Sequence, residues 1–272
     1  MSVLVLGGCG QLGRALARRG ACAVGRDEVD VTRPTTIAAA LARRRPSVVV
    51  NAAAFTAVDA CEGRRAEAFA VNGVGAGSVA SACAAFDVPL LHVSTDYVFG
   101  AGIAPFPPEA SPSPVQVYGE SKLAGERAVR GAGGRWAIVR TAWLFGPARR
   151  GFVAAVLAGA SDARGLRVVE AWGNPTPVDG LADTLLALAA ASPWGRTWHA
   201  AGDWEATWAD LADAVLAATG RRAPVGRVPP GSRPALARRP GDTRLDVGAT
   251  VARVGRRIDA RAAVRAYAEG WR

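Results

Sequence analysis

Short apolar runs alternate with longer amphipathic stretches through the first half of the chain. The runs at residues 2–6, 21–25, 47–50, 89–93 and 136–139 predict β-strands. The stretches at residues 14–19, 35–44, 62–85 and 122–130 predict helices, and Pro34 opens the second of them. The strand at residues 47–50 is a continuous apolar run after its first residue, which is typical of a parallel sheet buried on both faces. The alternation therefore predicts an α/β fold with a doubly wound parallel sheet.

The pattern changes after Gly146. Short helical stretches, prolines and loops alternate up to the C-terminus, apart from apolar segments at residues 177–191 and 197–200. We expect residues 1–146 and 176–202 to form one domain built on the sheet. Residues 147–175 and 203–272 are expected to form a small lobe from discontinuous segments. Residues 225–240 are rich in Pro, Gly and Arg and are predicted to be the most mobile connection.

Small and polar residues follow the predicted strands. The carboxyl ends of the strands in a doubly wound sheet lie at one edge, where ligands bind. Residues 7–13, 51–56, 94–97 and 141–143 should therefore line one cleft. The first segment carries glycines at positions 7, 10 and 13, between a predicted strand and a predicted helix. This placement predicts a dinucleotide-binding loop, and the spacing is similar to that of short-chain dehydrogenases.

Composition narrows the class of protein. The 272 residues, 50% of them hydrophobic, suffice for an α/β body with a smaller subdomain. No run of about 18 uncharged apolar residues occurs, so we expect no membrane span. The early first strand also leaves no room for a signal peptide. Four cysteines without C-x-x-C spacing, with only two histidines, predict neither a metal site nor a disulfide framework, so we expect a cytoplasmic location.

The formal net charge of +10 would suit an anionic ligand or nucleic acid. The arginines, however, are scattered in pairs and triplets, and no basic stripe is interleaved with aromatic residues. The abundance of Ala, Gly, Arg and Pro, with almost no Lys, is typical of a GC-rich coding bias. We therefore expect no nucleic-acid partner.

Lys122 is the only lysine among 33 basic side chains. It follows Tyr118 by four residues in Tyr118-Gly119-Glu120-Ser121-Lys122, so the two side chains share a helix face. Arginine carries a planar fork and cannot replace a compact ammonium on a flexible stem. An ammonium at this position can depress the pKa of the tyrosine and make the phenol a usable acid or base.

Longer motifs carry a resemblance to a known family. Tyr118-x-x-x-Lys122, with Thr95 after the fourth strand, is the constellation of short-chain dehydrogenases/reductases. The likeness is narrowed by residues 45–59 (RPSVVVNAAAFTAVD), 94–99 (STDYVF), 118–126 (YGESKLAGE) and 140–143 (RTAW). Residues 173–176 (GNPT) and 239–246 (RPGDTRLD) match more loosely. Over nearly its whole length the chain resembles the dTDP-4-dehydrorhamnose reductase family, within the extended short-chain dehydrogenase/reductase superfamily.

The resemblance implies a Rossmann-type, NAD(P)-binding first domain and a substrate-binding lobe. It implies reduction by NAD(P)H of the C4 ketone of a dTDP-linked 4-keto-6-deoxysugar. Tyr118 would give its proton to the forming alkoxide, Lys122 would hold the nicotinamide ribose and lower the pKa of Tyr118, and Thr95 would hydrogen-bond the ketone oxygen. The predicted cofactor-binding residues are Gly7, Gly10, Gln11, Leu12, Gly13, Arg26, Asp30, Val31, Ala52, Ala53, Ala54, Thr56, Asn72, Val93, Tyr118 and Lys122. The predicted substrate-binding residues are Thr56, Val58, Thr95, Asp96, Tyr118, Trp143 and Arg239.

Departures from related patterns bear on the substrate. Tyr97 follows Thr95-Asp96 where nucleotide-sugar 4,6-dehydratases carry a glutamate, which favours simple reduction. Residues 170–172 (EAW) and 242–243 (DT) differ from the family pattern. A 4-ketoreductase for a different nucleotide-linked natural-product sugar therefore stays open, as does a non-catalytic nucleotide-binding regulatory subunit.

Arg26 bears on the choice of cofactor. It lies at the end of the second predicted strand, where an acidic residue would bind the adenine ribose of NADH and an arginine would meet the 2′-phosphate of NADPH. Asp30 and Val31 would flank the adenine. We expect NADPH to be preferred and NADH to be usable, with a merely solvated Arg26 as the alternative. The protein is expected to be a monomer or a homodimer.

Overall fold

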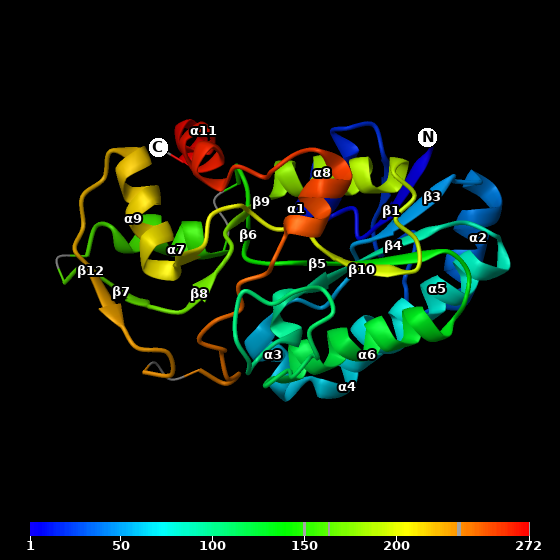
Figure 1. The fold of residues 1–272 in the computed structure, drawn as a ribbon, viewed down its shortest axis with the longest axis horizontal. Coiled ribbons are helices and arrows are strands. Elements are labelled where there is room, and N and C mark those ends of the chain that lie inside the picture. The colour runs from blue at the N-terminus through cyan, green and yellow to red at the C-terminus, as the bar shows by residue number, and fades with distance from the viewer. Residues whose placement is uncertain (149–150, 163, 233–234, 272) are drawn as a thin grey trace.

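The computed structural model describes residues 1–148, 151–162, 164–232 and 235–271, and within them six strands form one parallel sheet (Figure 1). The strand order is β10-β5-β4-β3-β1-β2, and every neighbouring pair is parallel. The strands are β1 (Val3–Leu6), β2 (Cys22–Val24), β3 (Val48–Asn51), β4 (Leu90–Thr95), β5 (Trp136–Thr141) and β10 (Arg196–His199). The predicted α/β fold with a doubly wound parallel sheet is confirmed.

Helices cover both faces of this sheet because successive strand side chains point to opposite sides. Val3 and Val5 pack toward α1 (Gln11–Ala17) and α8 (Val178–Ala190), whereas Leu4 and Leu6 belong to the core formed with α2 (Pro34–Arg44) and α5 (Ala76–Ala85). α6 (Val117–Gly131) packs along α5 on the second face. In Figure 1 α1 and α8 lie above the sheet, and α5 and α6 lie below it.

The predicted helix at residues 62–85 is wrong as a single element. The chain forms α3 (Val58–Gly63), then α4 (Arg65–Phe69), a π-helical segment (Ala70–Gly75) and α5. The π-helical turn carries Asn72, whose amide bonds the backbone of Phe55 through both its oxygen (2.8 Å) and its nitrogen (3.0 Å). The residues from Arg65 to Ala85 are long and apolar enough to cross a membrane by length and composition alone. Here they pack between α2 and α6.

Two helices begin earlier than predicted. α1 begins at Gln11 rather than at residue 14, directly after the glycine loop. α6 begins at Val117 rather than at residue 122, so Tyr118 and Lys122 lie on one helix. The Glu62 carboxylate accepts a hydrogen bond from the Val117 backbone N–H at 2.9 Å. This contact with a free backbone donor of the first turn favours the earlier start.

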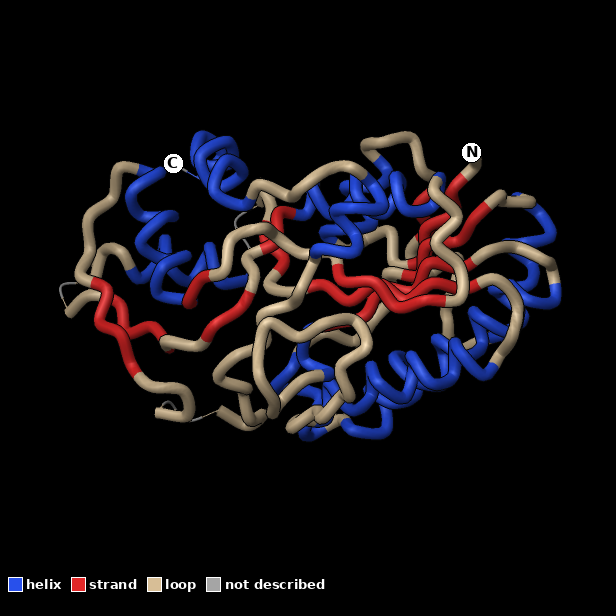
Figure 2. The backbone as a smooth tube through the Cα atoms, viewed as in Figure 1, coloured by secondary structure: helices blue, strands red, loops and turns tan. Residues whose placement is uncertain are grey.

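A smaller lobe lies beside the sheet, and Figure 2 shows its short strands apart from the six-stranded sheet. Its own apolar core gathers residues of α7 (Gly151–Gly159), α9 (Trp208–Thr219) and α11 (Ala260–Trp271). The strands around that core are β7 (Leu166–Val169), β8 (Trp172–Gly173), β11 (Ala206–Thr207) and β12 (Val225–Val228), while β6 (Leu144–Phe145) pairs with β9 (Thr176–Pro177). β12 falls within the predicted mobile connection and pairs with β7 instead; residues 233 and 234 of that connection lie outside the described residues.

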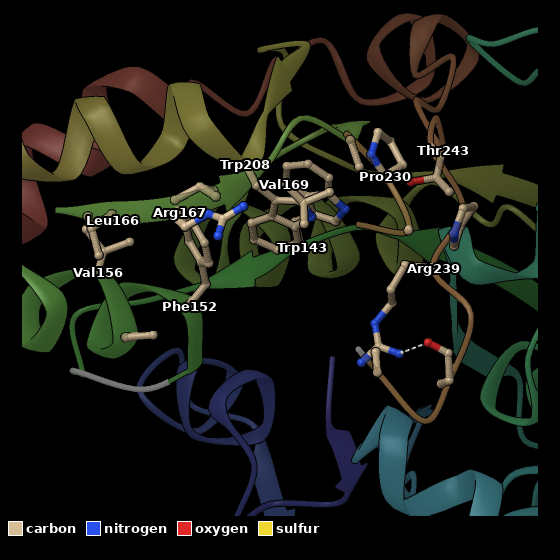
Figure 3. A pocket seen from close by; sticks show the side chains of 18 of the residues that line it. Trp143, Phe152, Val156, Leu166, Arg167, Val169, Trp208, Pro230, Arg239 and Thr243 are labelled. Carbon is tan, nitrogen blue, oxygen red and sulfur yellow. Dashed lines mark hydrogen bonds between the residues drawn. The ribbon is translucent and has the colours of Figure 1, made fainter. Parts of the chain in front are cut away.

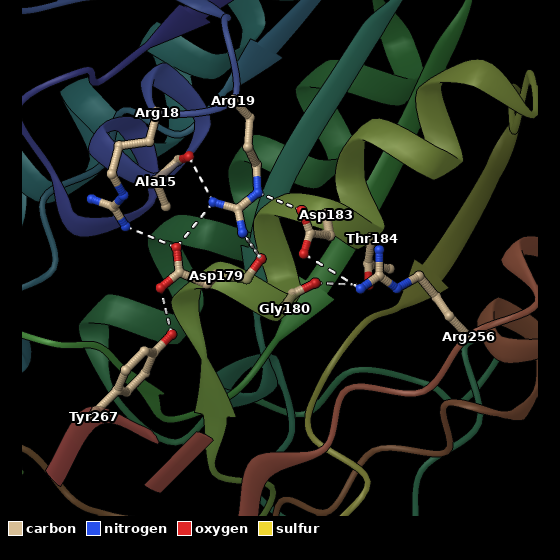
Figure 4. A network of polar contacts seen from close by, with 9 residues as sticks. All are labelled: Ala15, Arg18, Arg19, Asp179, Gly180, Asp183, Thr184, Arg256 and Tyr267. Carbon is tan, nitrogen blue, oxygen red and sulfur yellow. Dashed lines mark hydrogen bonds and ion pairs between the residues drawn. The ribbon is translucent and has the colours of Figure 1, made fainter. Parts of the chain in front are cut away.

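The part of the chain built on the sheet and the C-terminal segment are joined by helix packing as well as by polar contacts. α10 (Gly248–Val254) packs on α8 and β10. The Tyr267 hydroxyl of α11 donates to Asp179 of α8 at 2.5 Å, and Arg18 donates to the same carboxylate at 2.8 Å (Figure 4). Arg19, two residues after the end of α1, forms ion pairs with both Asp179 and Asp183. The predicted division into two domains stays a prediction.

Candidate active site

The glycine loop between β1 and α1 fits the close approach of a ligand to the backbone. Gly7 has a φ of +89°, and a Cβ there would lie 2.7 Å from the Ala53 nitrogen. A Cβ at Gly13 would lie 2.4 Å from the Gly7 carbonyl oxygen. No side chain caps the first turn at Gly10, so its backbone N–H groups are open to an anionic group. The residues present therefore fit a pyrophosphate-containing cofactor.

A cavity of about 840 Å³ extends from this loop along the carboxyl ends of the strands. It is the cleft that the sequence predicted, since the segments that follow β1, β2, β3, β4 and β5 all line it. The predicted site residues that line it are Gly7, Gly10, Gln11, Leu12, Gly13, Arg26, Asp30, Val31, Ala52, Ala53, Ala54, Thr56, Val58, Val93, Thr95, Asp96, Tyr118, Lys122, Trp143 and Arg239.

Asn72 is the predicted site residue that the structure does not bring to this cavity. It is buried, and its amide nitrogen donates to the Ser121 hydroxyl at 3.0 Å as well as to the Phe55 carbonyl. The amide thus holds the turn after β3 against α6. These contacts position neighbouring backbone, and the predicted contact of Asn72 with the cofactor stays a prediction.

Lys122 is almost fully buried, with 2% of its surface exposed, and its ammonium donates to the Val93 carbonyl at 2.7 Å. Burial lowers the pKa of Lys122 to about 8, against the opposing effect of the Glu126 carboxylate. The group is therefore mostly protonated at neutral pH and titrates within a usable range.

The pKa of Tyr118 differs from the value expected from the presence of Lys122 one helical turn away. Burial raises its pKa, and a hydrogen bond with Thr95 acts in the opposite direction. The net pKa of Tyr118 is therefore raised in the ligand-free protein rather than lowered as the sequence led us to expect. Desolvation wins because the phenol is packed among Tyr97, at 6.2 Å between ring centroids, and neighbouring apolar groups.

Asp96 lies beside these groups and is also buried. Its Oδ1 accepts the Thr95 hydroxyl at 3.0 Å, and its Oδ2 accepts the Thr243 hydroxyl at 2.6 Å. Burial raises the pKa of Asp96 to about 7, although the two threonine hydroxyls oppose that shift. Thr243 comes from the smaller lobe, and no sequence motif pointed to this contact.

A second cavity, of about 1290 Å³, opens into the smaller lobe (Figure 3). Five residues line both cavities and form the boundary between them: Tyr97, Trp143, Phe152, Trp208 and Arg239. The rings of Trp143 and Trp208 stack with centroids 3.6 Å apart, and Phe152 lies 4.6 Å from Trp208. The sequence pointed to Trp143 but not to Phe152 or Trp208, which come from α7 and α9 and share no motif with it.

Arg239 closes one side of this boundary. Its guanidinium forms a two-pronged ion pair with Asp59 of α3, with nitrogen–oxygen distances of 3.1 and 3.0 Å. The Ala237 N–H donates to the same carboxylate at 3.0 Å. The segment at residues 237–246 therefore reaches from the smaller lobe to α3. Among the described residues no cluster of three His, Cys, Asp or Glu side chains could hold a metal ion.

A cavity at the carboxyl edge of a parallel sheet, lined by the glycine loop and by Thr95, Tyr118 and Lys122, is characteristic of an oxidoreductase of the short-chain dehydrogenase/reductase class. The second cavity adjoins the first and could hold the part of a substrate that does not itself react. The chain belongs to the family described as the RmlD substrate binding domain, whose sequence profile matches residues 1–270.

Comparison with individual proteins places the chain among enzymes of deoxysugar synthesis. It is 43% identical over 248 residues to a dTDP-4-dehydrorhamnose reductase of Streptomyces griseus, covering 86% of this chain and 81% of that protein. It is 37% identical over 236 residues to a dTDP-4-keto-6-deoxy-D-glucose reductase of Streptomyces niveus, covering 84% and 81%. The solved dTDP-4-dehydrorhamnose reductase of Bacillus anthracis in complex with NADP superposes with a TM-score of 0.89 at 26% identity, covering 99% of this chain and 98% of that one.

Proposed function

We propose that this protein reduces the C4 ketone of a dTDP-linked 4-keto-6-deoxysugar with NAD(P)H. The observation that carries the proposal is that Thr95, Tyr118 and Lys122 line the same cavity as the glycine loop. The names of the relatives support the same reaction. The intact set of three also distinguishes an enzyme from a regulatory subunit of the same fold, which needs nucleotide binding alone.

The chemistry divides between the cofactor and the chain. When bound, the reduced nicotinamide supplies the hydride that adds to the carbonyl carbon. Tyr118 gives its proton to the carbonyl oxygen, and Thr95 donates a hydrogen bond to that oxygen as negative charge develops. Lys122 lies one helical turn from Tyr118 and lines the same cavity, where its ammonium would hold the nicotinamide ribose of the cofactor. The ketone gains one hydride and one proton, and the product is an alcohol.

The test of this function is oxidation of NADPH, followed at 340 nm, with dTDP-4-keto-6-deoxyglucose as substrate, with and without a 3,5-epimerase. Tyr118→Phe removes the proton donor and keeps the ring, so turnover should fall by roughly 10²–10⁴. Binding of NADP⁺, measured by fluorescence titration, should change little. A Tyr118→Phe variant with more than about half of the wild-type turnover would remove Tyr118 from the mechanism.

We further propose that NADPH is preferred over NADH because of Arg26. Its side chain is 72% exposed and lines the cavity just after β2, where it lies 3.2 Å from the Asp30 carboxylate. A 2′-phosphate would provide a second, doubly charged partner at this point.

Arg26→Ala tests the preference. The ratio of kcat/KM for NADPH to that for NADH should fall by roughly 5- to 150-fold, the range of a charge-assisted hydrogen bond. Arg127→Ala removes another exposed arginine that does not line the cofactor cavity, and it should leave the ratio unchanged. Equal kcat/KM for both cofactors in the wild type would reject the preference and leave the reductase proposal intact.

The identity of the sugar is a finer part of the proposal. Ala171 and Thr243 lie in the two segments where the sequence departs from the family pattern, and both line the second cavity. The relative from Streptomyces niveus is named for a different keto sugar from the rhamnose precursor. A 4-ketoreductase for another nucleotide-linked sugar is therefore the second candidate. Analysis of the product formed with and without the 3,5-epimerase distinguishes the two.

A further inference from the structure

Thr243 is a residue of the smaller lobe that reaches a carboxylate of the catalytic cavity. It is 2% exposed, and its N–H donates to the Trp172 carbonyl at 3.0 Å, which fixes its backbone. Its hydroxyl donates to Asp96 Oδ2 at 2.6 Å. The same hydroxyl lies 3.5 Å from the Trp172 carbonyl oxygen, at the limit of a hydrogen bond. Asp96 is therefore the partner that this side chain is placed to serve.

The contact continues into the reaction site through Asp96. Oδ1 of Asp96 accepts the Thr95 hydroxyl at 3.0 Å, while the Thr95 oxygen itself accepts the Tyr97 N–H at 3.1 Å. A hydroxyl has one proton and two acceptor positions, so each partner of Thr95 constrains what the others do.

With Asp96 as a carboxylate, this chain of hydrogen bonds leaves the Thr95 hydroxyl occupied. Thr95 gives its single proton to Asp96 Oδ1. One of its two acceptor positions is filled by the Tyr97 N–H. Thr95 then has no proton free for a ketone oxygen.

One proton added to Asp96 reverses this arrangement, provided that it lies on Oδ1. Asp96 then donates to the second acceptor position of the Thr95 oxygen. The proton of Thr95 is thereby released toward the ketone. Because Thr243 already donates to Oδ2, that oxygen is kept as an acceptor and the added proton is directed to Oδ1.

We propose that Thr243 is a positioning residue for the reduction, which acts through Asp96 to aim the hydroxyl proton of Thr95 at the ketone oxygen. The proposal rests on the ketoreductase function given above. It also gives the smaller lobe a direct part in the reaction, because the segment that carries Thr243 must be docked for the hydrogen-bond chain to be complete.

The active form is then the protonated Asp96, so activity should fall as the pH rises through its pKa. The pKa of Asp96 is raised by burial to about 7, and the Thr243 hydroxyl holds it lower than burial alone would. The titratable side chains that face Asp96 are Tyr97 beside it and Tyr118 of α6. Arg239 and Asp59 act on Tyr97 from the far side of the boundary, and Lys122 lines the same cavity.

The experiment compares pH profiles of kcat for wild type, Thr243→Val, Thr243→Ala and Thr243→Ser, with NADPH and the keto sugar that wild type reduces. Loss of the hydroxyl should move the descending midpoint to higher pH by about one unit, because the carboxylate loses a donor. The plateau at low pH should fall roughly two- to tenfold, because the proton is no longer directed to Oδ1. Thr243→Ser should keep both the wild-type midpoint and most of the plateau.

A second measurement needs no activity. The carboxyl carbon of Asp96 can be titrated by NMR in the ligand-free protein, assigned by its loss in Asp96→Asn, and its pKa should rise in Thr243→Val and in Thr243→Ala. Thr250→Val is the matched control, since Thr250 is a buried threonine of α10 whose hydroxyl has no partner among the described residues. It should leave the Asp96 titration unchanged.

The outcomes separate the two proposals. If wild type reduces no dTDP-linked keto sugar, the proposed function fails, whereas the NMR titration still decides whether Thr243 controls Asp96. A lowered plateau in Thr243→Val with an unchanged midpoint would show a packing role and overturn the positioning proposal. The same follows if Thr243→Ser behaves like Thr243→Val, or if the Asp96 titration is the same with and without the Thr243 hydroxyl.

Discussion

At the scale of one residue, the surroundings of Lys122 explain why an arginine would not serve at this position. The ammonium of Lys122 is buried and donates a hydrogen bond to the Val93 carbonyl. A guanidinium is broader, carries five N–H donors and keeps its charge, so it would be left with unsatisfied donors in this space. Burial also brings the pKa of the lysine to about 8, which an arginine could not reach.

Lys122→Arg should therefore lower kcat by roughly 10- to 1000-fold in spite of the conserved charge. Beyond the fall in activity near pH 7 that is assigned to Asp96, the wild-type profile of kcat/KM should show a second fall above pH 8 as the ammonium deprotonates, because the pKa of Lys122 is lowered to about 8. The variant keeps its charge at that pH, so this second fall should vanish and the fall near pH 7 should remain. The measurement is kcat/KM against pH for both proteins. A second fall above pH 8 that persists unchanged in Lys122→Arg would assign it to another group.

The sequence could predict those site residues whose short spacing along the chain, within one helix or at one strand end, indicates where their side chains lie. Tyr118 and Lys122 are one helical turn apart, and Thr95 ends a strand, so their proximity followed from local structure. Thr243 lies 147 residues from Asp96 along the chain, and no pattern records that contact. Asn72 was assigned to the cofactor because an amide can bind a ligand or backbone equally well, and spacing does not give its direction.

At the scale of elements, the pattern predicted strands better than helices. β1 to β5 are largely apolar runs, and each lies within two residues of its predicted position at either end, whereas β10 (RTWH) was foreseen only as an apolar segment at residues 197–200. The segment at residues 62–85 had the composition of one helix, yet it breaks at Arg64 and takes a π-helical turn over Ala70–Gly75, where Gly125 of α6 allows a close approach to Asn72. A Cβ at Gly125 would lie 2.1 Å from the Asn72 carbonyl oxygen. Such a division depends on a partner helix and is not encoded in the segment itself.

The smaller lobe was predicted as a change of pattern rather than as a set of elements. β6, β8, β9 and β11 have two residues each, too short for any periodicity to appear. The stacked pair of Trp143 and Trp208 joins residues of different segments, so neither tryptophan predicts the other. The order of the elements could be read from the chain, but the boundary between the two cavities could not.

At the scale of the whole molecule, one buried ion pair joins α6 to the sheet. Glu126 is fully buried and Arg140 of β5 is 2% exposed, with two nitrogen–oxygen contacts at 2.9 and 2.8 Å. Ser94 of β4 donates to the same carboxylate at 2.7 Å, and Arg130 adds a contact at 3.0 Å. Although burial acts to raise it, the net pKa of Glu126 is lowered by these donors and charges, so it is ionised at neutral pH.

Glu126→Gln should therefore lower the free energy of unfolding by about 3–5 kcal/mol, because Arg140 would be left buried without a countercharge. For a chain of this size that corresponds to a fall in Tm of roughly 6–20 °C. Asp59→Asn is the matched control, since its ion pair with Arg239 leaves the aspartate 48% exposed. Screening by solvent limits that pair to about 1 kcal/mol or less.

The pH dependence of stability provides a second test of the Glu126–Arg140 ion pair. A carboxyl whose pKa is lowered in the folded state stabilises the protein above its unfolded pKa, and the effect is lost as the pH falls through the folded value. The difference in Tm between wild type and Glu126→Gln should thus be full at pH 7 and shrink in acid, below about pH 4. Calorimetry across that range measures it. A Glu126→Gln variant no less stable than Asp59→Asn at pH 7 would mean that the joint between α6 and the sheet depends on apolar packing rather than on this ion pair.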